Sequence, residues 1–188
     1  MKVVGSNPTG STDVEYDSYM IVPATITTPM IVATAFNNHR AEHGQNVPLI
    51  ATSGGFDPLH VGHVRCIQSA AMLKGDDGLF VVIVNGDGFL ERKKGFVFMP
   101  IEERMELIAA IRGVDYVVSW DDGSQFVTEA IRAMKPNVFA KGGDRSTAEN
   151  VPEYDTCVEI GCAVVFGIGG ASKVQSSSEL VAKMQQPK

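Results

Sequence analysis

Cysteine is scarce in this 188-residue sequence, which has three, at positions 66, 157 and 162. They show no paired C-x-x-C spacing, so neither a zinc site nor a disulfide framework is expected. No apolar run is long enough to cross a bilayer, and the N-terminus lacks the basic and apolar regions of a signal peptide. These absences predict a cytoplasmic protein that keeps its thiols reduced and does not bind a membrane.

Positive charge is also in short supply. The 16 lysines and arginines are outnumbered by 22 acidic residues, and the net charge is −6. This balance argues against binding long nucleic acid through its phosphates. A small anionic ligand remains compatible with it, because a pocket can be locally basic.

Several common nucleotide and hydrolase motifs are missing. There is no G-x-x-x-x-G-K-[ST] phosphate loop and no G-x-G-x-x-G after the first strand of the core. The stretch GIGGAS near the end follows a strand but lacks the full dinucleotide fingerprint. No G-x-S-x-G nucleophile elbow occurs either. A P-loop enzyme, a nicotinamide-dependent enzyme and a serine hydrolase are therefore not expected.

From Pro48 onward, apolar runs alternate with helix-like segments. The strand-like runs are LIATS (49–53), LFVVIV (79–84), VDYVVSW (114–120), NVFAKG (137–142) and AVVFGIG (163–169). The helix-like segments are Gly62–Lys74, Pro100–Ile111, Ser124–Met134, Pro152–Ile160 and Ser177–Met184. This alternation predicts an α/β domain over residues 47–188, with a Rossmann-like, open, doubly wound parallel sheet of about five strands. In such a sheet ligands bind at the carboxyl ends of the strands.

Residues 1–46 form an N-terminal extension with a different character. A strand-like stretch at Tyr19–Ile26 precedes a helix predicted at Pro29–His43, which Thr28 can cap. Neither element can bury its apolar side chains alone. The extension therefore docks on its own domain or reaches across to a partner subunit, and we expect a homodimer. Its predicted interface includes Met30, Ile31 or Phe36.

The stretch GGFDPLHVGH, Gly54 to His63, lies where the first core strand passes into a helix. The two glycines allow the backbone to approach a ligand closely. The free N–H groups at the start of the helix favour an anion. His60 and His63 are three positions apart, which places both imidazoles on one face of the first turn. The pattern predicts a site for a phosphate chain.

This stretch resembles the H-x-G-H signature of the cytidylyltransferase-like nucleotidyltransferases. More closely, the chain resembles the adenylyltransferase domain of ADP-heptose synthases and glycerol-3-phosphate cytidylyltransferase. Four further stretches are similar to family motifs in the same order: VNGDGFLERKKG, MPIEERMELIAAIRGVDYVVSW, FAKGGD and QSSSEL. The first of them resembles the exit of the family's second strand followed by a mobile lysine loop. Glycerol-phosphate cytidylyltransferases carry an arginine a few residues before a turn of serines, which corresponds here to Ser176, Ser177 and Ser178 (the serine turn). In this sequence the stretch GGASKVQSSS has only Lys173 as a basic residue.

The resemblance implies a set of site residues. The catalytic residues would be His60, His63 and Lys94. Nucleotide-binding residues would be Gly54, Gly55, Phe56, Asp57, Gly62, Lys141, Gly142, Gly143, Asp144, Ser176, Ser177 and Ser178. Contacts to the acceptor or to phosphate would come from Asn85, Asp87, Arg92, Lys93 and Arg104. No dedicated metal site is expected, although Asp57 is a candidate contact for a metal ion.

The implied activity is transfer of AMP or CMP from ATP or CTP to a small phosphorylated acceptor, with release of pyrophosphate and with Mg²⁺ as cofactor. The acceptor would be a sugar or polyol phosphate. Two alternatives stay open: the same chemistry on a phosphonate, phospho-alcohol or flavin acceptor, and a nucleotide-binding module without catalysis. The choice between adenine and cytosine is not readable from the sequence, because these enzymes contact the base largely through backbone groups.

Overall fold

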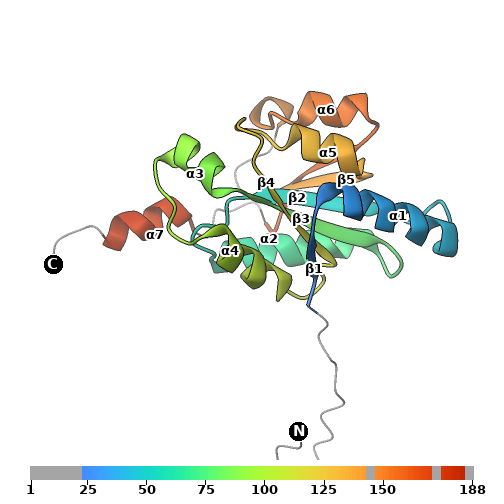
Figure 1. Ribbon diagram of the computed structural model, residues 1–188, viewed down its shortest axis with the longest axis horizontal. Coiled ribbons are helices and arrows are strands. Elements are labelled where there is room, and N and C mark those ends of the chain that lie inside the picture. Colours follow the sequence, from blue (N-terminus) through green and yellow to red (C-terminus); the bar gives the residue numbers. More distant parts are fainter. Residues whose placement is uncertain (1–22, 143–146, 171–174, 185–188) are drawn as a thin grey trace, which may run out of the picture.

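A computed structural model describes residues 23–142, 147–170 and 175–184 of the chain. Its centre is a six-stranded, all-parallel sheet with the strand order β1-β4-β3-β2-β5-β6 (Figure 1). The strands are β1 (Thr25–Thr27), β2 (Leu49–Gly54), β3 (Leu79–Asn85), β4 (Tyr116–Trp120), β5 (Val138–Gly142) and β6 (Ala163–Ile168). The predicted Rossmann-like architecture is confirmed, with one more strand than expected.

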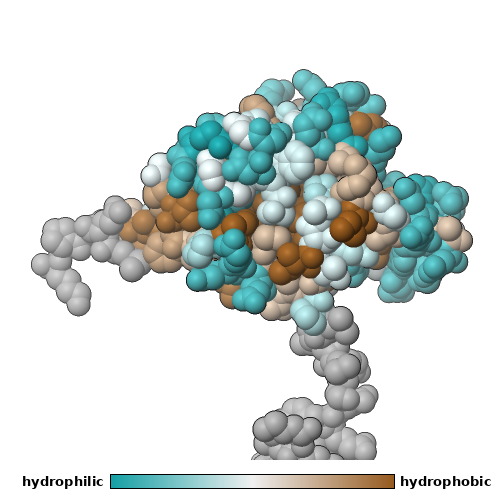
Figure 2. Space-filling view, in the orientation of Figure 1, coloured by the Kyte–Doolittle hydropathy of each residue, from teal (hydrophilic) through white to brown (hydrophobic). Residues whose placement is uncertain are grey.

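Helices connect the strands and cover both faces of the sheet. They are α1 (Pro29–His43), α2 (Val61–Ala71), α3 (Asp87–Lys94), α4 (Ile101–Ala109), α5 (Thr128–Met134), α6 (Tyr154–Glu159) and α7 (Ser177–Met184), with single 3-10 turns at Met72–Lys74 and Ala148–Asn150. The described residues contain no helix that is long and apolar enough to cross a membrane. Figure 2 shows hydrophilic residues over most of the visible surface, with hydrophobic groups interspersed among them.

Successive side chains along the strands point to opposite faces of the sheet and pack into two hydrophobic cores. On β5, Phe139 packs into the core shared with α1, α5 and α6, whereas Ala140 packs into the core shared with α2 and α4. In Figure 1, α5 and α6 lie on one side of the sheet, and α2 and α4 lie on the other. The sheet is therefore buried on both faces, as the continuous apolar runs predicted.

The N-terminal extension packs on its own domain. Strand β1 pairs with β4 and supplies the additional edge strand. Helix α1 places Val32 and Phe36 in the core, where they are 0% and 3% exposed. Of the three residues predicted at a dimer interface, Phe36 is thus covered within the chain, while Met30 and Ile31 are exposed. The described extension begins at residue 23, so the start of the strand-like stretch from Tyr19 lies outside the described residues.

The segment after β3 is a helix, where we expected a mobile lysine loop. Helix α3 has the charge pattern that stabilises a helix, with Asp87 in its first turn and Arg92, Lys93 and Lys94 in its last. Gly95 ends it in the left-handed conformation, with φ of 80°. The expectation of a loop was wrong, because the acidic first turn, the basic last turn and the terminal glycine are together the signals of a helix.

Candidate active site

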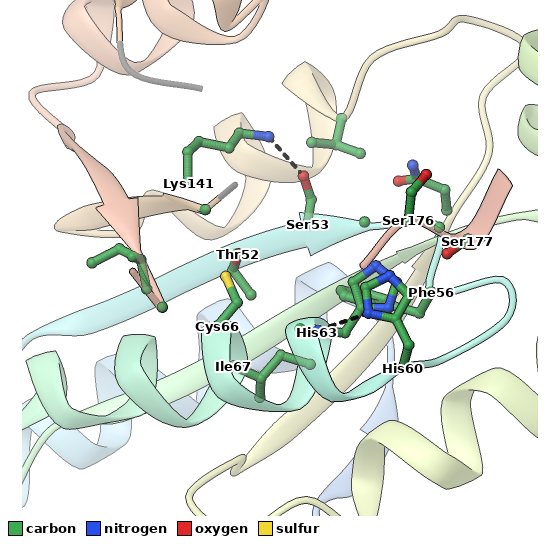
Figure 3. Close-up of a pocket in the computed structure, with 18 of the residues that line it drawn as sticks. Thr52, Ser53, Phe56, His60, His63, Cys66, Ile67, Lys141, Ser176 and Ser177 are labelled. Carbon is green, nitrogen blue, oxygen red and sulfur yellow. Dashed lines mark hydrogen bonds between the residues drawn. The ribbon is translucent and has the colours of Figure 1, made fainter. Parts of the chain in front are cut away.

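A cavity of about 470 Å³ opens at the carboxyl ends of β2, β3 and β5 (Figure 3). Its lining includes Ser53, Gly54, Gly55, Phe56, His60, Gly62, His63, Cys66, Asn85, Phe89, Lys93, Gln125, Val127, Lys141, Gly142, Glu153, Gly169, Ser176, Ser177 and Ser178. The chain leaves β2 toward β3 on one side and returns to β5 on the other. The cavity therefore lies at the point where the strand order reverses, which is the usual ligand position in an open α/β sheet.

The turn that follows β2 is held by its two glycines. Phe56 has a positive φ of 51° and is buried with its ring against Gly54, where a Cβ atom would lie 2.8 Å from the ring. A Cβ atom on Gly55 would lie 2.8 Å from the side chain of Leu90 in α3. We predicted these glycines for close approach to a ligand. The structure gives a further reason, because any side chain here would collide with the protein itself.

His60 and His63 lie together at the start of α2. His60 is the N-cap residue, and its Nδ1 atom accepts a hydrogen bond of 3.4 Å from the backbone N–H of His63. The two rings stack, with centroids 3.7 Å apart, and Phe56 meets the His63 ring edge-on. Because Nδ1 of His60 is an acceptor, a neutral His60 carries its proton on Nε2. Figure 3 shows both imidazoles beside Ser176 and Ser177.

Both histidines have a lowered pKa. Burial is the main cause for His63, and the neighbouring His60 and Lys94 add to it, which brings its pKa to about 3. Burial also lowers the pKa of His60, although a hydrogen bond from the ring to its own backbone opposes the effect. At neutral pH His63 is uncharged in the absence of ligand. The pair therefore offers neutral N–H donors next to the N–H groups of the helix.

Lys94 pairs with Asp57 beneath the turn. Its ammonium group donates to the carbonyl oxygen of Asp57 at 2.8 Å and to the carboxylate at 3.0 Å. The carboxylate is 1% exposed and also accepts from the backbone N–H groups of Phe98 and Met99. Lys94, which we predicted in the catalytic group, is thus engaged in an ion pair and is not among the residues that line the cavity.

A resident metal ion does not fit these donors. The carboxylate of Asp57, the predicted contact, already accepts hydrogen bonds on both oxygens. In the described part of the chain no three His, Cys, Asp or Glu side chains are arranged to hold a metal.

Arg104 is fully buried and ties the loops of the site together. Its guanidinium donates to the carbonyl oxygens of Gly55 and Asn85 at 2.7 Å, and to that of Met99 at 2.8 Å. It also forms an ion pair with Asp87 at the start of α3. Both charged residues were predicted to contact acceptor or phosphate. In the structure they connect the exits of β2 and β3 to α4.

Arg92 and Lys93, the two basic residues of α3 besides Lys94, make different contacts. Arg92 forms an ion pair with Asp121 and donates to the carbonyl oxygen of Ser124. Asp121 also accepts from the backbone N–H of Phe89, so this pair anchors α3 beside the end of β4. Lys93 lines the cavity with its ammonium over the Phe89 ring. Of the basic residues at 92–94, only Lys93 borders the cavity.

Lys141 and Gly142 end β5 inside the cavity. Lys141 is 6% exposed, donates to the hydroxyl of Ser53 at 3.0 Å and lies 3.4 Å from a carboxylate oxygen of Glu153. Gly142 faces Cys66 of α2, where a Cβ atom would lie 2.3 Å from the sulfur. Burial raises the pKa of the Cys66 thiol, and Lys141 opposes this. Gly143 and Asp144, predicted to bind nucleotide, lie outside the described residues.

The serine turn closes the cavity on the side of α2. Ser176, Ser177 and Ser178 line it, and α7 begins at Ser177 as predicted. The Ser177 hydroxyl donates to the carbonyl oxygen of Pro58 at 2.9 Å, which connects this turn to the loop before α2. Segments that are more than a hundred residues apart in the chain therefore meet at the histidine pair.

Sequence reasoning missed several lining residues. Ser53 could have been found, because it stands one residue before the end of β2. Cys66 could also have been found, since it lies on the same helix as the histidines, one turn beyond His63. Glu153 and Gln125 carry no local signal, because they reach the cavity from segments before α6 and α5.

The family model described as Cytidylyltransferase-like matches residues 51–166. The bifunctional protein HldE of Methylococcus capsulatus is 36% identical over 115 residues, which are 60% of this chain and 23% of that protein. The HldE protein of Pseudomonas fluorescens is 31% identical over 149 residues, which are 75% of this chain and 28% of that protein. The chain thus spans about a quarter of the length of these relatives.

Among solved structures, the lipopolysaccharide core biosynthesis protein of Thermoplasma volcanium matches with a TM-score of 0.53 and 22% identity. The match covers 68% of this chain and 98% of that one. At this identity the likeness concerns the fold.

Proposed function

The chain belongs to the cytidylyltransferase-like family of nucleotidyltransferases, and we propose that it transfers AMP or CMP from a nucleoside triphosphate to a small phosphorylated acceptor. The acceptor would be a sugar or polyol phosphate. The observation that carries the proposal is the stacked pair of neutral histidines at the N-terminus of α2, inside a cavity at the switch point of the sheet.

The chemistry needs donors that follow negative charge from substrate to product. An oxygen of the acceptor phosphate attacks the α-phosphorus and forms a new P–O bond, while the bond to the bridging oxygen of the β-phosphate breaks and pyrophosphate leaves. The nucleotide is taken as its magnesium complex. No protein nucleophile is needed, so positioning and charge stabilisation account for catalysis.

The described residues suit this task. The Nε2–H group of His60, the imidazole of His63 and the N–H groups at the start of α2 would donate to the phosphate oxygens. The serine turn would hold the leaving phosphates, because Ser176 and Ser177 lie beside the imidazoles (Figure 3). Neutral imidazoles donate without repelling the nearby Lys94, which is consistent with the low pKa of His63.

Pyrophosphate release tests the proposal directly. ATP and CTP are each assayed with Mg²⁺ against a panel of sugar and polyol phosphates, and we expect turnover with at least one pair. His63→Ala should lower kcat about 10²- to 10³-fold, since it removes one donor to the transferring phosphate. His43→Ala, an exposed histidine of α1, is the matched control and should behave as wild type.

Two outcomes would contradict the proposal. One is the absence of turnover with every pair from protein that is folded by circular dichroism. The other is a His63→Ala variant that turns over at the wild-type rate. If instead a nucleotide binds to wild type and variant equally but neither releases pyrophosphate, the chain is a binding module.

We also propose that the protein is a homodimer that uses the exposed side chains of α1. Met30 and Ile31 are 67% and 54% exposed, an unusual degree for large apolar residues that lie next to each other. Light scattering of wild type and of Met30→Lys measures this. A dimer that the substitution weakens is expected, and a wild-type monomer would contradict it.

A further inference from the structure

A second group of polar side chains lines the cavity on the sheet face opposite the histidines. Asn85, Ser53 and Lys141 stand at the carboxyl ends of β3, β2 and β5, which are neighbours in the sheet. Lys141 follows Phe139 by two residues and its ammonium lies over the Phe139 ring at 4.2 Å, so it faces α5 and α6. Ser53 is on the same face, because Lys141 donates to it. Figure 3 shows these two side chains on one side of β2 and the imidazoles on the other.

Two acceptor oxygens in this part of the cavity lack a donor. The side-chain oxygen Oδ1 of Asn85 and the carboxylate oxygen Oε2 of Glu153 are both buried and have no hydrogen-bond partner. Glu153 is 5% exposed, and its 3.4 Å approach to Lys141 is an ion pair without the geometry of a hydrogen bond. Buried acceptors are nearly always satisfied in proteins, so these two oxygens point to a ligand that brings donors.

The remaining wall of this region is apolar. Phe89 of α3 and Val127, the residue before α5, line the cavity and are 3% and 1% exposed. Lys93 stands at the rim over the Phe89 ring. A ligand here would therefore meet an aromatic and aliphatic wall, two oxygen acceptors and a cation at the edge. A short carbon chain that carries several hydroxyl groups and a phosphate matches this set.

The nucleotide would bind on the other side of the cavity, next to α2. On the α2 face, Gly142 and Gly169 press against Cys66, with a Cβ atom on Gly169 only 2.8 Å from the Cα atom of Cys66. The backbone of these glycines borders the cavity on the same face as His60 and His63, and we place the nucleotide on this side. The acceptor would then reach the α-phosphorus of the nucleotide from the opposite face of the strand ends.

We propose that Glu153 and Asn85 determine acceptor specificity by accepting hydrogen bonds from hydroxyl groups of the acceptor. Lys141 holds the Glu153 carboxylate in position through their ion pair, and Ser53 accepts a hydrogen bond from Lys141. The inference rests on the proposed function and narrows it, because an acceptor without hydrogen-bond donors on its carbon chain, such as a simple alkyl phosphate, cannot satisfy both oxygens.

The test compares Glu153→Gln with wild type, using glycerol 3-phosphate and mannose 1-phosphate as hydroxylated probes and ethyl phosphate as the probe without hydroxyl groups. We expect Glu153→Gln to raise KM for the hydroxylated acceptor about tenfold to hundredfold, the loss typical of a hydrogen bond to a buried charge. KM for the nucleotide should change less than twofold. The preference of wild type for the hydroxylated probe over ethyl phosphate should shrink by the same factor.

A binding measurement separates this inference from the proposed function. The melting temperature is recorded with a non-hydrolysable α,β-methylene triphosphate, with and without each acceptor probe. Wild type and Glu159→Gln, an exposed neighbour on α6, should both be stabilised further by the hydroxylated probe. Glu153→Gln and Asn85→Ala should both respond to the nucleotide analogue but not to the acceptor.

Three results would overturn the inference. The first is equal use of ethyl phosphate and the hydroxylated probes by wild type. The second is a folded Glu153→Gln variant whose acceptor KM is unchanged. The third is a variant whose defect falls on the nucleotide, with altered preference between ATP and CTP, which would place the base on this face. The proposed function survives each of these results, whereas the absence of pyrophosphate release with every acceptor would contradict it.

Discussion

The low pKa of His63 should make the stability of the folded protein depend on pH. His63 is neutral in the folded state because burial, His60 and Lys94 lower its pKa from 6.5 to about 3. In the unfolded chain the imidazole regains its ordinary pKa. Below pH 6.5 the unfolded state therefore binds a proton that the folded state does not, and the free energy of unfolding falls as the pH falls from 6.5 toward 3.

The size of the effect follows from proton linkage. One proton bound only in the unfolded state changes the free energy of unfolding by about 1.4 kcal/mol per pH unit. Between pH 7 and pH 5 the imidazole of His63 should thus account for a loss of about 2 kcal/mol. Carboxylates that titrate in this range contribute as well. A His63→Asn variant keeps those carboxylates and lacks the imidazole, so it isolates the contribution of His63.

Urea denaturation at pH 7 and pH 5 measures the difference. Wild type should lose about 2 kcal/mol more than His63→Asn on going to pH 5. His60→Asn is a second control that keeps His63 in place, and it should retain most of the wild-type dependence. The reasoning is refuted if wild type and His63→Asn lose the same stability. It is also refuted if the His63 imidazole titrates near its ordinary pKa by NMR in the ligand-free protein.

Two further substitutions test the packing beneath and beside the cavity. Asp57→Asn leaves the ammonium of Lys94 without its buried partner, so unfolding free energy should fall by about 3 kcal/mol or more in urea denaturation, and an unchanged value would contradict the role of this pair. Gly142→Ala places a methyl group against the Cys66 sulfur and should lower stability by about 1–3 kcal/mol. Adding Cys66→Ala to that variant should restore part of the loss, and a double variant that is no better than Gly142→Ala would argue against the clash.

Much of the fold could be predicted because local pattern and global structure agree. The five apolar runs from Leu49 onward are all strands, and α7 begins and ends at the predicted residues. Helix α3 was missed since its stability comes from charges and a terminal glycine, not from an apolar stripe. The bounds of strand β1 could not be predicted from the sequence, because three residues form a strand only when β4 is present to pair with them.

The residues of the candidate site were likewise predictable where the sequence signal is local and not where it is long-range. His60 and His63 were predictable since both the capping position and the spacing are local. The direction of Lys94 was not, because Asp57, its partner, is distant in the sequence. Glu153 was missed for a related reason, as it depends on how the chain returns from β5 toward α6. Residue type and position along a strand indicate which strand ends form the site. Which charged side chains face the cavity depends on ion pairs between loops.

The docking of β1 and α1 has a consequence for how the chain is made. These elements leave the ribosome before the rest of the described fold, yet β1 pairs with β4 and α1 packs on α5, both about ninety residues later in the sequence. At about 5–20 residues per second, the apolar side of α1 waits for several seconds without its partner. During that interval Val32 and Phe36 are available to a chaperone or to another nascent chain. The segment that is synthesised first thus completes its packing late, and substitutions there should affect the yield of folded protein before they affect the assembled enzyme.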